Sequence, residues 1–530
     1  MMHVERRMAI EGGAAILAAV LRRTRLRKGT GAAPARRRVL MAVTMACSAA
    51  ALSPAASATS GTSGTSGTSG TIELMQLLGT IQADEGIPAF GLVLMDEGQP
   101  TLVTAQGRTG NPSRPVADSD TPFRVGSISK TFTALTAMAL VESGDLELNA
   151  PVSPTVAREF INPWQDTHPV QLVHLLGLTA GLADLSRAEF DNNDPTPLTL
   201  AAALALAPEQ RRILWPPGSR HSYTNVAPGL TALLIEERTG ERFEAVARRR
   251  VLEPLDMPNA TFLRNAYLIE NLPRGYRAGG TDEIPYWHMT YRAFGGLSAT
   301  PRELSKFLTA LLNDGKLDGR QAIGVRTIRQ MLRPTTSLAS NAGLPIGYGL
   351  GIYGTVRDGF VFFGHGGDGD GFLARYGLLP NSGRGYFLVI NSDDPPALGR
   401  MRRAIERHLT RDLGRPERPL KVDLPDSRLK QLSGTYYPSS TRFQVDAWRT
   451  GTLPCAHITP GEDGLRLRRA GRTITLLPVT QTLFRRPADP LATVVFIASA
   501  GKLHLQGELG NYTRVEPPGS GASIAPCNSQ

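Results

Sequence analysis

Three short motifs in this sequence carry residue types suited to acyl transfer. They are the S-x-x-K run Ser127-Ile128-Ser129-Lys130, the Y-x-N run Tyr223-Thr224-Asn225 and the H-x-G run His365-Gly366-Gly367. Residues three apart share one face of a helix, so the Lys130 amine is expected beside the Ser127 hydroxyl. Burial would lower the pKa of that lysine and leave it able to accept a proton. The spacing therefore predicts a serine nucleophile, Ser127, with a lysine base, Lys130.

The S-x-x-K pattern alone is weak evidence, because it occurs three times in the chain. Ser427-Arg428-Leu429-Lys430 falls in a connection between two domains, and Ser499-Ala500-Gly501-Lys502 spans an expected hairpin turn. Only Ser127 is expected to open a helix, over residues 127–142, within a large domain. The Y-x-N and H-x-G motifs each occur once and follow Ser127 in order, which favours Ser127 as the nucleophile.

The segment from Phe123 to Ala134 resembles the nucleophile segment of class C β-lactamases, D,D-carboxypeptidases and related esterases. Four further stretches are similar to the same family: 145–152, 254–257, 294–298 and 364–372. The resemblance runs from about residue 73 to 412. It implies an α+β domain in which helices flank an antiparallel sheet.

The resemblance also implies a role for each motif. Ser127 is acylated, Lys130 and Tyr223 exchange its proton, and Asn225 holds the substrate amide. The backbone N–H groups of Ser127 and Asp368, the residue after Gly367, would form the oxyanion hole.

His365 stands where many relatives carry the lysine of a K-T-G motif, and the chain has no K-T-G. An imidazole in that place would anchor a substrate carboxylate only while it is protonated, at the lower end of the neutral range. This difference favours a peptidase or esterase over a β-lactamase. A second departure, at 176–182, is interpreted as structural.

The run 364–369 also matches G-x-G-x-x-G, which in dinucleotide-binding proteins must open a helix. A strand is expected after it instead. Asp368 and Asp370 lack the other ligands of a calcium loop. The sequence therefore predicts neither a cofactor nor a metal.

The order of predicted elements supports an α+β domain followed by a small all-β domain. A helix is expected from Ile72 through Ile81, then a hairpin of strands 89–95 and 100–106. Late strands are expected at 346–353, 360–363, 371–379 and 385–391, with a helix at 397–411. After 415–419, short strands separated by glycines predict a C-terminal sandwich or barrel with no catalytic motif, so acylation is expected to survive its removal.

The leader is strongly basic. Residues 1–38 carry a formal charge of +8, so the chain from Thr59 onward holds only +3 of the total of +11. A nucleic-acid-binding surface is therefore not expected. The basic stretch, the apolar run 39–52 and the A-x-A site 56–58 predict an export signal and a periplasmic or extracellular location. No run of 18 apolar residues predicts a transmembrane helix.

The expected domain boundaries follow from these patterns: signal 1–58, Thr-Ser-Gly linker 59–72, hydrolase domain 73–412, linker 413–427, β domain 428–517 and tail 518–530. In an oxidising compartment, Cys455 and Cys527 are candidates for a disulfide.

The function expected from the sequence is an exported serine hydrolase. Its substrate would be a small ester or a D-amino-acid peptide, including peptides derived from peptidoglycan. Two alternatives stay open: a true β-lactamase, and a penicillin-binding sensor or cell-wall binding protein that does not hydrolyse.

Overall fold

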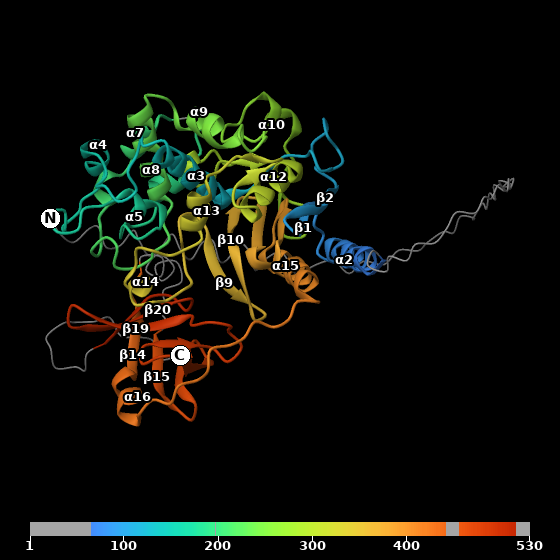
Figure 1. The fold of residues 1–530 in the computed structure, drawn as a ribbon. Coiled ribbons are helices and arrows are strands. Elements are labelled where there is room, and N and C mark those ends of the chain that lie inside the picture. The colour runs from blue at the N-terminus through green and yellow to red at the C-terminus, as the bar shows by residue number, and fades with distance from the viewer. Residues whose placement is uncertain (1–64, 197, 441–454, 516–530) are drawn as a thin grey trace, which may run out of the picture. The chain divides into compact units, whose positions relative to one another are not determined.

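The computed structural model describes residues 65–196, 198–440 and 455–515. The predicted signal, the first part of the linker and the C-terminal tail lie outside these ranges. A six-stranded sheet with the order β2-β1-β12-β11-β10-β9 lies at the centre of the large domain (Figure 1). All of its neighbouring strands are antiparallel. The strands are β1 (Ala89–Asp96), β2 (Gln99–Gly107), β9 (Tyr353–Arg357), β10 (Phe360–Gly369), β11 (Phe372–Leu379) and β12 (Arg384–Ile390).

Both faces of this sheet are covered, and the alternation of side chains along β1 shows it. Phe90, Leu92 and Leu94 pack in one apolar cluster with the helices α2 (Thr65–Asp84) and α15 (Pro395–Thr410). Ala89 and Val93 point the other way, into the larger cluster. Successive side chains of a strand point to opposite faces, so a strand buried on both sides is apolar throughout.

The second face carries most of the helices. The longest are α3 (Ser129–Glu142), α8 (Val226–Thr239) and α12 (Pro301–Leu312). Shorter ones are α4 (Pro154–Ala157), α5 (Leu172–Leu176), α6 (Arg187–Asp191), α7 (Leu200–Leu204), α9 (Phe243–Ala247), α10 (Ala266–Asn271), α11 (Arg292–Gly295), α13 (Val325–Met331) and α14 (Leu338–Asn341). Short strand pairs join them: β3 (Phe123–Arg124) with β6 (Ser298–Ala299), β4 (Gly275–Arg277) with β5 (Glu283–Ile284) and β13 (Ser392–Asp393), and β7 (Lys316–Leu317) with β8 (Arg320–Gln321).

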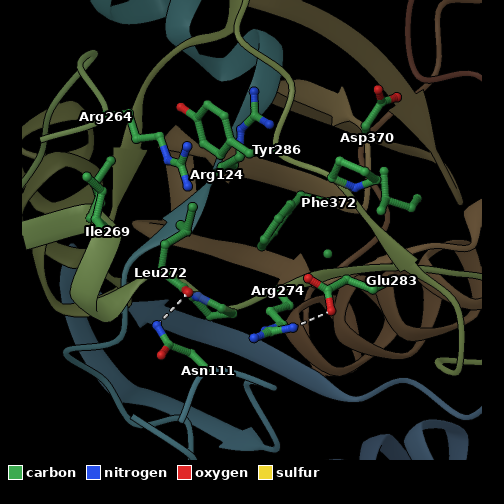
Figure 2. Close-up of a pocket in the computed structure, with 15 residues that line it drawn as sticks. Asn111, Arg124, Arg264, Ile269, Leu272, Arg274, Glu283, Tyr286, Asp370 and Phe372 are labelled. Atoms are coloured by element: carbon green, nitrogen blue, oxygen red, sulfur yellow. Dashed lines mark hydrogen bonds and ion pairs between the residues drawn. The ribbon is translucent and has the colours of Figure 1, made fainter. Parts of the chain in front are cut away.

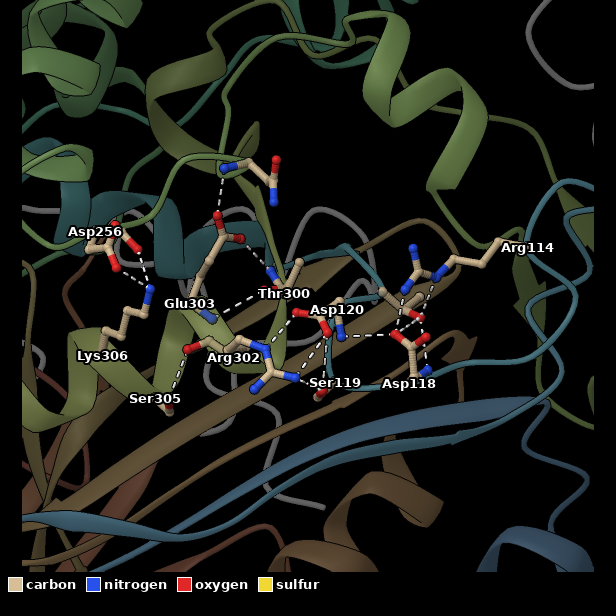
Figure 3. A network of polar contacts seen from close by, with 12 residues as sticks. Arg114, Asp118, Ser119, Asp120, Asp256, Thr300, Arg302, Glu303, Ser305 and Lys306 are labelled. Atoms are coloured by element: carbon tan, nitrogen blue, oxygen red, sulfur yellow. Dashed lines mark hydrogen bonds and ion pairs between the residues drawn. The ribbon is translucent and has the colours of Figure 1, made fainter.

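The N-terminus of α12 fixes the strand that leads to Ser127. Thr300 and Glu303 form a capping box, in which each side chain accepts the backbone N–H of the other residue. Arg302 forms an ion pair with Asp120 at 2.7 Å (Figure 3). Asp120 lies three residues before β3, and Thr300 immediately follows its partner β6. This polar network therefore holds the entry to the nucleophile segment from both strands.

The α+β class, the hairpin β1–β2 and the late helix are confirmed. Two expected elements differ. The helix α2 begins at Thr65, inside the predicted linker, because a helix nucleated by the packing of Leu74 and Leu78 extends at little further cost. The predicted strand 346–353 does not form, since Gly351 has a φ of +72° and the run turns back on itself, with Tyr348 opposite Tyr353.

The C-terminal part is a closed barrel, which decides between the two expected β architectures. A short helix α16 (Asp426–Leu432) precedes it. Its strands are β14 (Gly434–Pro438), β15 (Ala456–Gly461), β16 (Gly464–Arg469), β17 (Arg472–Pro478), β18 (Leu483–Arg485), β19 (Val494–Ser499), β20 (Lys502–Gly507) and β21 (Tyr512–Arg514). Cys455 is disulfide-bonded. Its expected partner Cys527 lies outside the described residues, so that pairing stays a prediction.

The barrel has its own core, and it also shares a smaller apolar cluster with the hydrolase domain. That cluster joins Leu344 and Ile346 to Ala492 and Val495. The hydrolase domain and the barrel therefore contact one another through apolar side chains. Within the described ranges, no helix is long and apolar enough to cross a membrane.

Candidate active site

The nucleophile segment is a tight turn that leads directly into a helix. Gly126–Ile128 forms one 3₁₀ turn, and α3 follows from Ser129. Gly126 has a φ of +51°, in the left-handed region that favours glycine. The turn leaves Ser127 partly exposed, whereas Lys130 is only 3% exposed. A substrate can thus reach the hydroxyl while the amine stays shielded from water.

The amine of Lys130 is held by hydrogen bonds to distant parts of the chain. Nζ lies 3.0 Å from Ser127 Oγ, 2.7 Å from Asn225 Oδ1 and 3.1 Å from the carbonyl oxygen of Phe294. The last two atoms can only accept, so they fix two N–H groups of the amine. The amine also lies 3.0 Å from the Ser127 hydroxyl, which is close enough for the direct proton exchange that a general base requires.

The two other S-x-x-K runs lack this environment. Ser499 and Lys502 pair across the β19–β20 hairpin, as expected. Ser427 lies on α16, so being on a helix does not by itself distinguish Ser127. The burial of the lysine distinguishes the two runs: Lys130 is buried, whereas Lys430 is exposed and no acceptor of the described chain holds its amine.

The Y-x-N motif lies at the start of α8, beside Lys130. Lys130 Nζ lies 4.7 Å from the centre of the Tyr223 ring. The Asn225 backbone N–H donates to Asp184 Oδ1 at 2.7 Å, and Thr224 Oγ1 donates to the carbonyl of Ala183. Since Asn225 Oδ1 accepts from Lys130, its amide N–H groups stay directed to other acceptors. They are suited to a substrate carbonyl.

The H-x-G motif lies on β10, which passes against the nucleophile turn at van der Waals contact. A Cβ at position 367 would overlap the carbonyl oxygen of Val125 and lie 2.9 Å from Ser127 N. A Cβ at position 126 would lie 2.9 Å from Asp368 N. Only glycines allow this approach, which brings the strand that carries the Asp368 N–H against the turn that carries the Ser127 N–H. The Asp368 side chain is turned away, in an ion pair with Arg375 at 2.6 Å.

His365 differs from the role expected for it. The residue is 2% exposed, its Nδ1 donates to the Gly366 carbonyl, and its Nε2 accepts from the Tyr348 hydroxyl at 3.0 Å. Burial, together with the nearby Lys130, lowers the pKa of His365 to about 3. A neutral imidazole cannot anchor a carboxylate, so the expected pH-dependent cation is not supported at this position. His365 instead supports the Tyr223 region, with ring centres 6.3 Å apart.

Three groups of this site were not predicted from the sequence: the Asp184 carboxylate, the Phe294 carbonyl and the Tyr348 hydroxyl. Phe294 lies in a stretch that resembles the family. Its contact uses the backbone carbonyl, which every residue has, so the residue type could not indicate this role. Asp184 follows the segment 176–182, which does act structurally, because Ser222 N donates to the Leu178 carbonyl. The sequence could have indicated Asp184, because an aspartate close to a glycine turn often accepts hydrogen bonds from backbone N–H groups.

The fold and the placement of Ser127, Lys130 and Tyr223 are those of the class of proteins that includes β-lactamases and penicillin-binding proteins. The family model described as Beta-lactamase matches residues 74–411, and the chain belongs to that family. It is 25% identical to a Beta-lactamase of Yersinia enterocolitica over 44% of this chain and 57% of that protein. It is 24% identical to Penicillin-binding protein 4 of Amycolatopsis lactamdurans over 52% of this chain and 73% of that protein.

A solved structure supports the fold over a larger part of the chain. The octameric penicillin-binding protein homologue from Pyrococcus abyssi is similar with a TM-score of 0.53 and 23% identity, covering 84% of this chain and 100% of the other. The chain spans only 57% of the Yersinia enterocolitica relative. The match to this relative therefore does not extend to its whole length.

Proposed function

We propose that this protein hydrolyses small esters or D-amino-acid peptides through an acyl-enzyme on Ser127. The observation that carries the proposal is the environment of Lys130. Its Nζ is 3.0 Å from Ser127 Oγ and is oriented by Asn225 and Phe294 in a buried setting.

In the acylation step, Lys130 accepts the Ser127 proton while Oγ attacks the substrate carbonyl carbon. The carbonyl oxygen becomes an oxyanion, which accepts hydrogen bonds from the N–H groups of Ser127 and Asp368. Collapse of the tetrahedral intermediate breaks the bond to the leaving alcohol or amine. Tyr223, above whose ring the Lys130 amine lies, relays the proton that Lys130 took from Ser127 to that leaving group, so the amine is neutral again before deacylation.

Deacylation repeats the sequence with water as the nucleophile. The same base removes a proton from water, the carboxylic acid is released, and the Ser127 hydroxyl is restored. Asn225 holds an amide group of the substrate other than the reacting carbonyl, through its amide N–H groups.

A true β-lactamase is the alternative within the same family. It is less well supported, because the buried and neutral His365 supplies no cation for a β-lactam carboxylate. The second alternative is a sensor that is acylated but does not hydrolyse. It uses the same Ser127–Lys130 contact, so only turnover distinguishes it from the proposed hydrolase.

A hydrolysis panel distinguishes these functions. Purified protein is assayed with short-chain aryl esters, with peptides that end in two D-amino acids, and with nitrocefin. Turnover of esters or D-peptides without nitrocefin turnover supports the proposal. Turnover of nitrocefin alone would favour a β-lactamase, and stoichiometric acylation without any turnover would favour a sensor.

We also propose that the protein is exported, from the basic leader and the A-x-A site at 56–58. The secreted form should begin near Thr59 and gain two mass units on reduction if Cys455 pairs with Cys527. Intact-mass analysis with and without reductant checks both points. A full-length protein retained in the cytoplasm would contradict export.

A further inference from the structure

A pocket of about 290 Å³ lies beside the nucleophile segment and has no part in the mechanism above (Figure 2). Its lining includes Arg124, Arg264, Tyr286 and Asp370. Arg124 lies three residues before Ser127, and Asp370 two residues after Asp368. A chain spans at most about 3.6 Å per residue, so these lining residues lie within about 11 Å and about 7 Å of the two oxyanion-hole residues, Cα to Cα.

Two guanidinium groups of this pocket share one aromatic ring. The Cζ atoms of Arg124 and Arg264 lie 4.4 and 4.5 Å from the centre of the Tyr286 ring. Arg124 is 3% exposed, and the carbonyl of Trp287 accepts from its Nη2 at 3.0 Å. The ring orients the guanidinium groups without neutralising their charge.

The acidic residues around the pocket leave this charge largely uncompensated. Glu283 is in an ion pair with the third arginine, Arg274, at 2.5 Å (Figure 2). Asp370 is exposed and forms no ion pair within the described chain, although its charge acts on Arg124 at longer range and opposes the lowering of the pKa of Arg124 by burial. Among the described residues, no carboxylate lies within ion-pair distance of Arg124 or Arg264. A buried guanidinium without a carboxylate is suited to receiving one from a ligand, in the paired geometry that arginine favours.

We propose that this pocket binds the carboxylate of a small molecule. The carboxylate belongs either to the acyl chain of the substrate, which would make the pocket a specificity subsite of the proposed hydrolase, or to a separate small carboxylic acid. The first case rests on the proposed function and the second does not.

The binding test uses full-length Ser127→Ala protein, so that no turnover occurs. Glutarate is titrated by calorimetry, with uncharged glutaramide as its control. Glutarate should bind and glutaramide should not, and the added change Arg264→Gln should weaken glutarate at least tenfold. Arg264 is exposed, so the folded state tolerates this change. Arg329→Gln, at an arginine whose side chain is 70% exposed, is the matched control and should leave binding unchanged.

The source of the carboxylate is tested with two aryl esters in the protein with Ser127 intact. The 4-nitrophenyl monoester of glutarate is compared with 4-nitrophenyl valerate. If the substrate supplies the carboxylate, Arg264→Gln lowers the kcat/KM ratio of these esters at least tenfold. If the ratio holds while glutarate binding is lost, the ligand is a separate acid.

The proposed hydrolase function and the proposed carboxylate pocket can fail independently. Failure to hydrolyse either ester counts against the proposed function and leaves the glutarate titration to judge the pocket. No glutarate binding, or binding that Arg264→Gln leaves unchanged, would overturn the pocket proposal.

Discussion

At the scale of single residues, the main feature of the site is the set of oxygen atoms that surrounds the Lys130 amine. Lys130 Nζ faces two fixed oxygens and the Ser127 hydroxyl. His365 sits behind Tyr223 with both ring nitrogens hydrogen-bonded. The motif that resembles a substrate anchor therefore serves a different purpose here, as a neutral support.

The protonation state of His365 gives a pH prediction. Because its pKa is lowered to about 3, the imidazole is neutral from pH 5.5 to 8 and its charge does not change in that range. The kcat/KM ratio of a carboxylate-bearing ester to a matched neutral ester should thus be flat over this range. Steady-state kinetics at half-unit pH steps measure it. A ratio that falls as pH rises would show a titrating imidazolium at the site.

At the scale of elements, a strand and a turn are in direct contact where the oxyanion hole is proposed. The β10 strand can approach the turn at Gly126 only because Gly367 has no side chain. Backbone N–H groups placed in this way need no reorganisation during the reaction, which is the source of their catalytic effect.

Substitution of that glycine tests the contact. Gly367→Ala places a methyl group against the Val125 carbonyl and pushes β10 away from Ser127. Acylation should fall by about 10²–10³-fold, the usual loss for one oxyanion-hole donor. Gly369→Ala, on the same strand, is the matched control, because a Cβ there meets only Met289 Cε, at an ordinary contact distance of 3.9 Å. Acylation rates and melting temperatures of both variants are compared; equal rates would contradict the assignment.

Sequence patterns predicted these elements unevenly. The continuous apolar run 89–95 and the apolar spacing of 127–142 determine a buried strand and a helix almost without tertiary help. The run 346–353 looks extended in composition, yet its glycines allow a turn that places Tyr348 against His365. Spacing and resemblance identified Ser127, Lys130 and Tyr223 as candidates. They could not show that His365 is buried, since burial depends on Tyr348 and on the packing of β9 and β10.

At the scale of the whole molecule, the barrel contacts the loop that leads to Tyr223. Asn511 Nδ2 donates to the His221 carbonyl at 2.5 Å, and Gln506 Nε2 donates to the Ser219 carbonyl at 3.3 Å. The His221 ring in turn stacks on Tyr348 at 4.9 Å. These contacts give the barrel a larger part in the site than its sequence suggested.

Removal of the barrel should therefore slow acylation rather than leave it unaffected. In full-length protein, Asn511→Ala leaves the His221 carbonyl without its donor, at a cost of about 1–3 kcal/mol, and should lower the acylation rate several-fold. Lys502→Ala, at the exposed tip of a barrel hairpin, is the control. Rates are measured with a fluorophosphonate probe. A rate for Asn511→Ala equal to that of the control would restore the view of the barrel as an independent unit.

The central claim is that Ser127 is the acylated nucleophile. Wild-type protein, Ser127→Ala, Ser427→Ala and Ser499→Ala are each incubated with a fluorophosphonate probe, and intact mass is recorded. The two distant variants should gain one probe mass as the wild type does. Ser127→Ala should gain none, because loss of a nucleophile costs several orders of magnitude in rate. Persistent labelling of Ser127→Ala would contradict the account.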